Sequence, residues 1–271
     1  MHRPPTRLSI AAAILAWSLT ALHAHAQGFP PSALGDVYAQ RIDRQLSIPP
    51  DEQRHYAALL TQQLTETGHA GLPPQYVLLV DRSPQVQAIL LFWLSEEGQP
   101  ELIGASPVST GREGHFMYYE TPLGVYDHSM ANPDFRAEGT ENSQGIMGYG
   151  VKGMRVYDFG WVPARRTWRP GTGIMRLQMH ATDPRSLEKR LGTVQSMGCI
   201  RIPATLNRLL DHYGLLDADY EGAMRNGRTS WMLPPDREST GASGRYLVIV
   251  DTGRATRPDW SPIGNPAKGR P

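Results

Sequence analysis

The chain has 271 residues, with 27 lysines and arginines against 26 aspartates and glutamates. This balance argues against a nucleic-acid-binding protein, which usually carries a basic excess. The length suffices for one large domain or two small ones. With 27 glycines and 23 prolines the composition favours strands and loops over a helical bundle, and a single cysteine excludes an internal disulfide and a thiolate metal cluster.

Residues 1–26 have the features of a secretory signal peptide. Two arginines precede the apolar run Leu8–Leu22, and Ala24-His25-Ala26 fits a small-x-small cleavage site. The run has 15 residues, fewer than the ~20 that span a bilayer. Cleavage would leave 25 basic and 26 acidic residues, because the segment contains two arginines and no acid. No later stretch is apolar enough to span a membrane, so we expect an exported, periplasmic protein without a transmembrane segment.

The next segment, residues 27–74, is expected to form a small helical unit and a linker. Residues 33–44 and 50–67 are polar with spaced apolar positions, and two acids follow Pro50, as in the first turn of a helix. Gly-Leu-Pro-Pro at 71–74 then interrupts the pattern and marks the linker.

Short apolar runs between turns predict a catalytic domain over 75–253 that is mainly β. One helix is expected at 203–213, where apolar residues recur at helical spacing. His115 and His128 lie in expected loops and should be solvated, and residues 254–271, rich in Pro, Gly and Arg, should be disordered. The expected strands cover 76–80, 86–94, 102–110, 125–126, 145–149, 155–161, 173–180 and 245–251.

The residues that carry chemistry lie between His180 and Arg201. Alternation over 174–180 places His180 on the polar face of a strand, at its end. Cys199 has no partner thiol in an exported chain, so it is an inert buried thiol, an intermolecular link or a nucleophile. A histidine within hydrogen-bond reach can deprotonate a thiol and later protonate a leaving amine, so the two residues form a coherent acyl-transfer pair.

Two backbone features support this interpretation. Gly198 permits a tight turn before the thiol and can expose N–H groups to a developing oxyanion. The helix expected from Pro203 would favour the thiolate if its N-terminus points at the sulfur. The six histidines of the mature chain form no HExxH motif and there is no CxxC motif, so we expect no metal site.

His180, fifteen intervening residues and then Ser-x-Gly-Cys-Ile-Arg from Ser196 to Arg201 resemble the signature of the L,D-transpeptidase family, which has a YkuD-type catalytic domain. The segments PVSTGREG and TPLGVY, and the apolar hairpin before them, are similar to upstream features of that family. The resemblance covers a core from 75 to 203. It implies an antiparallel β sandwich or barrel-like fold with few helices, here preceded by the helical segment.

The resemblance also implies an activity, the cross-linking of peptidoglycan stem peptides. Cys199 would attack a donor stem peptide and form a thioester, with His180 as general base and then acid. N–H groups around Gly198 and Cys199 would stabilise the oxyanion. An amine of an acceptor stem would resolve the thioester, and no metal or cofactor is needed.

Five further residues are candidates for a supporting role, and a purely structural role is open for each. Ser196 would orient the cysteine loop, and Arg201 would hold a substrate carboxylate through two hydrogen bonds. The remaining candidates for substrate binding are Thr182, Tyr118 and Tyr119.

Met197 departs from the family pattern, because most members have histidine there. A thioether neither shuttles a proton nor donates a hydrogen bond. This departure indicates a divergent subgroup with an altered donor or an atypical cross-link. Two alternatives stay open: an L,D-carboxypeptidase or endopeptidase-type hydrolase on the same scaffold, and a catalytically silent peptidoglycan-binding protein.

Overall fold

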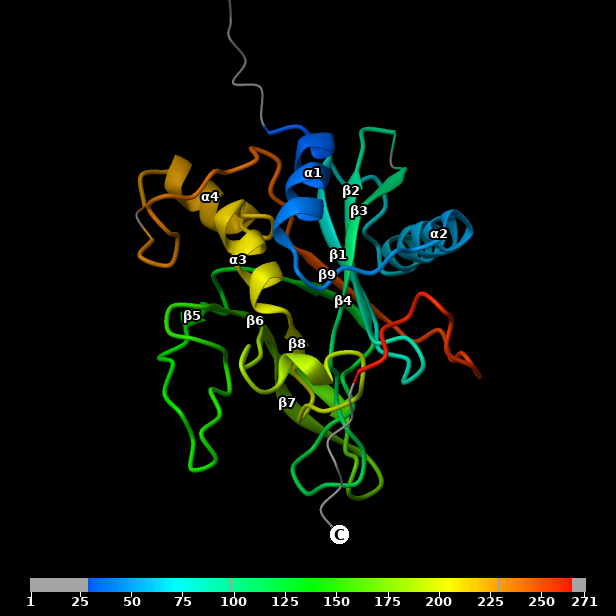
Figure 1. Ribbon diagram of the computed structural model, residues 1–271. Coiled ribbons are helices and arrows are strands. Elements are labelled where there is room, and N and C mark those ends of the chain that lie inside the picture. The colour runs from blue at the N-terminus through cyan, green and yellow to red at the C-terminus, as the bar shows by residue number, and fades with distance from the viewer. Residues whose placement is uncertain (1–28, 98, 229, 265–271) are drawn as a thin grey trace, which may run out of the picture.

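Two β-sheets and four α-helices form the described part of the chain, which is residues 29–97, 99–228 and 230–264 of a computed structural model (Figure 1). The expected signal peptide lies outside these residues. The five-stranded sheet has the order β3-β2-β1-β9-β4, and the four-stranded sheet has the order β5-β6-β7-β8. None of the described helices is both long and apolar enough to cross a membrane.

The helices are α1 (Pro31–Arg41), α2 (Pro50–Glu66), α3 (Ala204–His212) and α4 (Ala218–Arg225). The strands are β1 (Gln75–Asp81), β2 (Ala88–Leu94), β3 (Pro100–Pro107), β4 (Gly124–Asp127), β5 (Phe135–Arg136), β6 (Arg155–Arg165), β7 (Thr172–Ala181), β8 (Ile200–Ile202) and β9 (Tyr246–Val250).

Both sheets are mixed, which corrects the expectation of an antiparallel, mainly β fold. β1 pairs with β9 in parallel and β7 pairs with β8 in parallel, whereas the other pairs are antiparallel. A parallel neighbour requires a long crossover between the two strands. The apolar pattern that revealed each strand carries no information on its partner's direction. The architecture is therefore α/β, and the two helices expected before the domain are confirmed as α1 and α2.

The five-stranded sheet is covered on both faces, which explains the continuous apolar run of β1. Leu78 and Val80 pack into a core shared with α1, α3 and the second sheet. Val77 and Leu79, the alternate residues of the strand, pack against α2. In Figure 1, α1 and α2 accordingly lie on opposite sides of β1, β2 and β3.

Helix α1 is fastened into this core by more than apolar contact. The Tyr38 hydroxyl is 2.5 Å from the hydroxyl of Ser106. The Tyr38 ring lies so close to Gly104 that a Cβ there would be 2.4 Å from it. A glycine at this position of β3 therefore makes room for the helix.

The domain boundary that the sequence analysis expects near residue 74 stays a prediction.

Three local expectations were wrong. Residues 145–149 form a loop, whereas the sequence suggested a strand, and α4 was not expected. The tail is ordered over residues 254–264: the Trp260 ring packs edge-on against Tyr56 at 5.8 Å, and Arg254 donates to Glu52 at 2.5 Å. Residues 265–271 lie outside the described part of the chain.

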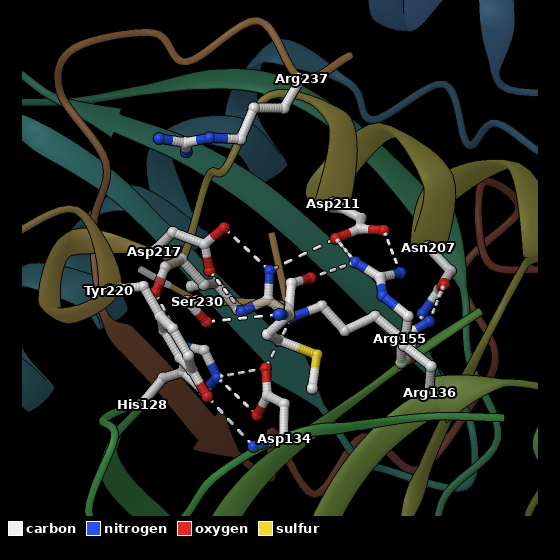
Figure 2. Close-up of polar contacts among 12 residues, drawn as sticks. His128, Asp134, Arg136, Arg155, Asn207, Asp211, Asp217, Tyr220, Ser230 and Arg237 are labelled. Atoms are coloured by element: carbon white, nitrogen blue, oxygen red, sulfur yellow. Dashed lines mark hydrogen bonds and ion pairs between the residues drawn. The ribbon is translucent and has the colours of Figure 1, made fainter. Parts of the chain in front are cut away.

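A buried ionic network joins the loop after β4 to β6 and the start of α4 (Figure 2). His128, expected to be solvated, is fully buried at its centre. Its Nδ1 donates to the Leu216 carbonyl at 2.7 Å, and its Nε2 donates to Asp134 at 2.8 Å. Arg155, also buried, donates to Asp134 at 2.6 Å and to Asp217 at 2.8 Å.

Candidate functional site

His180 lies on the polar face of β7, one residue before the strand ends, and is paired with Arg201 of β8. Its Nδ1 donates to the Ala181 carbonyl at 2.7 Å. This bond fixes the tautomer and leaves the lone pair of the neutral ring on Nε2. The side chain is only 4% exposed, and burial lowers the pKa of His180 to about 4, with the Arg201 charge acting in the same direction.

Cys199 immediately precedes β8 and is partly exposed. Residues two apart along an extended chain share a face, so its side chain lies on the same face as that of Arg201. Burial raises the pKa of the Cys199 thiol, although the Arg201 guanidinium and a backbone hydrogen bond with Gln178 oppose the shift. The resting pair therefore consists of a neutral thiol and a neutral imidazole.

The N-terminus of helix α3 has a carboxylate partner, and the expected effect of this helix end on the thiol stays a prediction. The first helical amide, that of Ala204, donates to the Glu188 carboxylate at 2.7 Å. The partial positive charge of this helix end is thus matched by Glu188, and the pKa of Cys199 is raised and not lowered.

The segment from Ser196 to Cys199 is held in a compact turn. Gly198 has a φ of +126°, and a Cβ there would lie 2.8 Å from Met175, so only glycine fits. The Ser196 hydroxyl accepts the Gly198 N–H at 3.0 Å and donates to the Cys199 carbonyl at 2.5 Å. The Gly198 amide is therefore already engaged. The Met197 side chain points outward and is 48% exposed.

Thr121, which the sequence analysis did not single out, clamps this turn from outside. Its hydroxyl donates to the Gly198 carbonyl at 2.7 Å and accepts the Gly111 N–H at 2.9 Å. Tyr119 adds a backbone bond, since its N–H donates to the Met197 carbonyl at 3.1 Å. The Thr-Pro-x-Gly motif was a signal for Thr121, and its role here is to fix the cysteine segment.

The other candidate residues lie in different surroundings. The Arg201 side chain is near Cys199 and Tyr118, and its Nε is buried without a hydrogen-bond partner among the described residues. Tyr118 is half-buried, and its carbonyl accepts the Thr167 N–H at 3.1 Å. Thr182 lies just after β7 and is buried, and its hydroxyl has no hydrogen-bond partner among the residues that the structure describes.

Two more residues of the site were missed. The Tyr149 ring packs nearly edge-on against the His180 ring, with centroids 4.7 Å apart. The Tyr149 hydroxyl is 3.4 Å from Gln178 Oε1, and the Gln178 amide nitrogen donates to Asp158 at 2.8 Å. Gln178 was detectable from its alternation with His180. Tyr149 was not, because it lies in an irregular loop between β5 and β6.

Tyr149 also borders a cavity of about 530 Å³. The cavity is formed by β5 and the loop that follows it. Since Tyr149 contacts His180 as well, this loop links the cavity to the imidazole. Among residues 29–97, 99–228 and 230–264, no three His, Cys, Asp or Glu side chains are grouped to hold a metal ion.

Comparison with known proteins gives a distant structural likeness. No protein-family model matches the chain, and no curated protein sequence matches it. Its structure is similar to that of Pgp2, the helical cell shape determining protein of Campylobacter jejuni. The two chains are 10% identical, with a TM-score of 0.29, and the match covers 87% of this chain and 59% of that one. At this level the site geometry must carry any conclusion about function.

Proposed function

We propose that the protein is a periplasmic L,D-transpeptidase that cross-links peptidoglycan stem peptides. The observation that carries the proposal is that Cys199 immediately precedes β8, the strand whose Arg201 pairs with His180 at the end of β7, while the Tyr149 ring packs on His180. The thiol is partly exposed, and the imidazole has its Nδ1 proton fixed and its Nε2 lone pair available. A thiol and an imidazole base on neighbouring strand ends support a proposal of nucleophilic acyl transfer.

The reaction begins from the neutral pair. His180 Nε2 takes the thiol proton as the sulfur attacks the carbonyl carbon of a stem-peptide amide. The carbonyl π electrons move to oxygen and form a tetrahedral oxyanion. When this intermediate collapses, the C–N bond breaks, the leaving amine takes the proton from His180, and a thioester on Cys199 remains.

The second half of the reaction determines the product. An amine of a second stem peptide loses its proton to His180 and attacks the thioester, which yields a cross-link and restores the thiol. Arg201, whose buried Nε has no partner among the described residues, pairs with a substrate carboxylate beside the sulfur. Water in place of the amine would give hydrolysis.

The test is incubation of the purified protein with a disaccharide-tetrapeptide and sequencing of the products by tandem mass spectrometry. We expect cross-linked dimers from the wild type and none from Cys199→Ala or His180→Gln. His212→Gln, at the far end of α3, serves as the matched control and should retain activity. Trimmed monomers alone would identify a hydrolase, and unchanged products from Cys199→Ala would refute both enzymatic functions.

A further inference from the structure

Acyl transfer at Cys199 would put a negative charge on the substrate carbonyl oxygen, and loss of one donor to such an oxyanion typically costs about 10²–10³ in rate. The cysteine segment has few donors to offer. The Gly198 N–H donates to the Ser196 hydroxyl, which itself donates to the Cys199 carbonyl. The Met197 side chain has no hydrogen to donate. The backbone amides of Met197 and Cys199 remain in this segment, and that of Cys199 belongs to the residue that carries the sulfur.

Tyr149 is the candidate for a second donor. Its ring packs on His180 at 4.7 Å, and its hydroxyl approaches Gln178, the residue whose backbone bonds to Cys199. Negative charge on the Cys199 sulfur raises the pKa of the Tyr149 phenol, with burial as the larger cause. The phenol is therefore within electrostatic reach of the sulfur.

The hydroxyl proton of Tyr149 is oriented but weakly held. The Gln178 amide nitrogen donates to Asp158, which also accepts from Arg176 Nε at 2.6 Å, so Gln178 presents its oxygen to the phenol. The distance of 3.4 Å between the two oxygens exceeds the usual range of about 2.5–3.0 Å for an O–H···O bond. A stronger acceptor nearby can therefore take this proton donor from Gln178.

We propose that the Tyr149 hydroxyl is the second donor to the oxyanion, together with the Cys199 amide. The inference rests on the proposed function, since it needs an acyl group on Cys199. As the S–C bond forms and the carbonyl electron pair moves to oxygen, the Tyr149 O–H turns from Gln178 Oε1 to that oxygen. No proton leaves Tyr149, because His180 takes the thiol proton and later delivers it to the leaving group.

The protonation state of Tyr149 suits this role. Burial raises the pKa of the phenol above its usual value, and the nearby Asp158 carboxylate acts in the same direction. The phenol thus remains a hydrogen-bond donor at neutral pH. The edge-on contact with His180 positions the ring, so replacement by phenylalanine removes the donor and preserves the packing.

The experiment uses two probes of Cys199, the single cysteine of the chain, read by intact-protein mass. p-Nitrophenyl acetate acylates a thiol through a tetrahedral oxyanion, whereas iodoacetamide alkylates it by displacement at carbon without one. Rates are compared for the wild type and Tyr149→Phe, with Cys199→Ala as the background. Tyr126→Phe is the matched control, since that hydroxyl donates to the Leu123 carbonyl beside β4.

We expect Tyr149→Phe to slow acylation by roughly 100- to 1,000-fold, as loss of an oxyanion donor does, and to leave alkylation unchanged. The Tyr126→Phe control should change neither rate. If Tyr149→Phe slowed both reactions equally, the proposal would be overturned and Tyr149 would be a positioning residue. If it slowed neither reaction, the proposal would also be overturned, because Tyr149 would have no role in acylation. A wild type acylated no faster than Cys199→Ala would instead refute the acyl chemistry of Cys199 itself.

Discussion

Cys199 and His180 rest uncharged, because burial shifts the two pKa values in opposite directions: that of the thiol is raised and that of the imidazole is lowered to about 4. A preformed thiolate–imidazolium pair would require the reverse order. In the proposed reaction the thiol would therefore lose its proton during the attack, with His180 as the general base. Arg201 favours the thiolate but also disfavours a charged imidazole.

This order of pKa values predicts the pH profile of acyl transfer. His180 remains an unprotonated base down to about pH 4, so the acid limb of kcat/KM should lie near that pH and not near the ordinary histidine value of about 6.5. The measurement is the rate of Cys199 acylation between pH 3.5 and 8. An acid limb near 6.5 would contradict the neutral resting pair.

At the scale of elements, the cysteine segment is held in place by a segment of the chain that lies 77 positions before it. Thr121 bonds the Gly198 carbonyl and the Gly111 amide, and Tyr119 bonds the Met197 carbonyl. The turn at 119–121 thus aligns the thiol with the end of β7, and the motif serves the site through backbone geometry.

Thr121→Val tests this clamp, since valine preserves the shape and removes the hydroxyl. The Gly198 carbonyl and the Gly111 amide would lose their partner, and each buried unsatisfied group costs about 1–3 kcal/mol. We expect a lower free energy of unfolding in urea and slower acylation of Cys199. Thr121→Ser, which keeps the hydroxyl, should retain most of both. Equal losses in the two variants would show that the methyl packing matters and the hydroxyl does not.

At the scale of the whole molecule, the C-terminal helices are joined to the second sheet by buried charge. Burial alone would lower the pKa of His128, but the Asp134 carboxylate outweighs it and the pKa is raised. Protonated His128 therefore stabilises the fold. This contribution is complete below the unfolded value of about 6.5 and is lost as the pH rises through the folded pKa.

Asp134→Asn should reveal this linkage. Removing one partner from a buried ion pair costs about 3–5 kcal/mol, because the remaining charges are left uncompensated. We expect a large fall in the urea midpoint at pH 6.5. Above that pH the stability of the wild type should decline, and the stability of the variant should decline less. An equal pH dependence in the two proteins would contradict the stabilising role of protonated His128.

Helix α1 supplies the second test at this scale. Leu34 is fully buried in the core between α1 and the sheets. Leu34→Ala should destabilise the whole protein by about 2–5 kcal/mol, as truncation of a buried leucine does. Val37→Ala on the same helix, at a half-buried position, should cost less. A loss confined to residues 29–74, seen by hydrogen exchange, would instead indicate a separately folding N-terminal segment.

The elements were predicted best where burial imposes a period. Alternation identified β7, and helical spacing identified α3, because each buries one face. The loop that holds Tyr149 has no such period, and its place over His180 is set by contacts with the end of β7, such as the bond from the Met147 amide to Asp183 at 3.1 Å. His128 was misjudged for a related reason, since a histidine in a loop looks solvated until its distant partners are known.

The sequence by itself determined three of the four described α-helices, most strands and the candidate pair Cys199 and His180, because local periodicity and residue chemistry are written along the chain. Only the tertiary structure decided the parallel strand pairs, the Glu188 partner of α3 and the place of Tyr149. Each of these depends on contacts between residues far apart in the chain. Strand direction and the burial of a charge are properties of such contacts, and no local pattern encodes them.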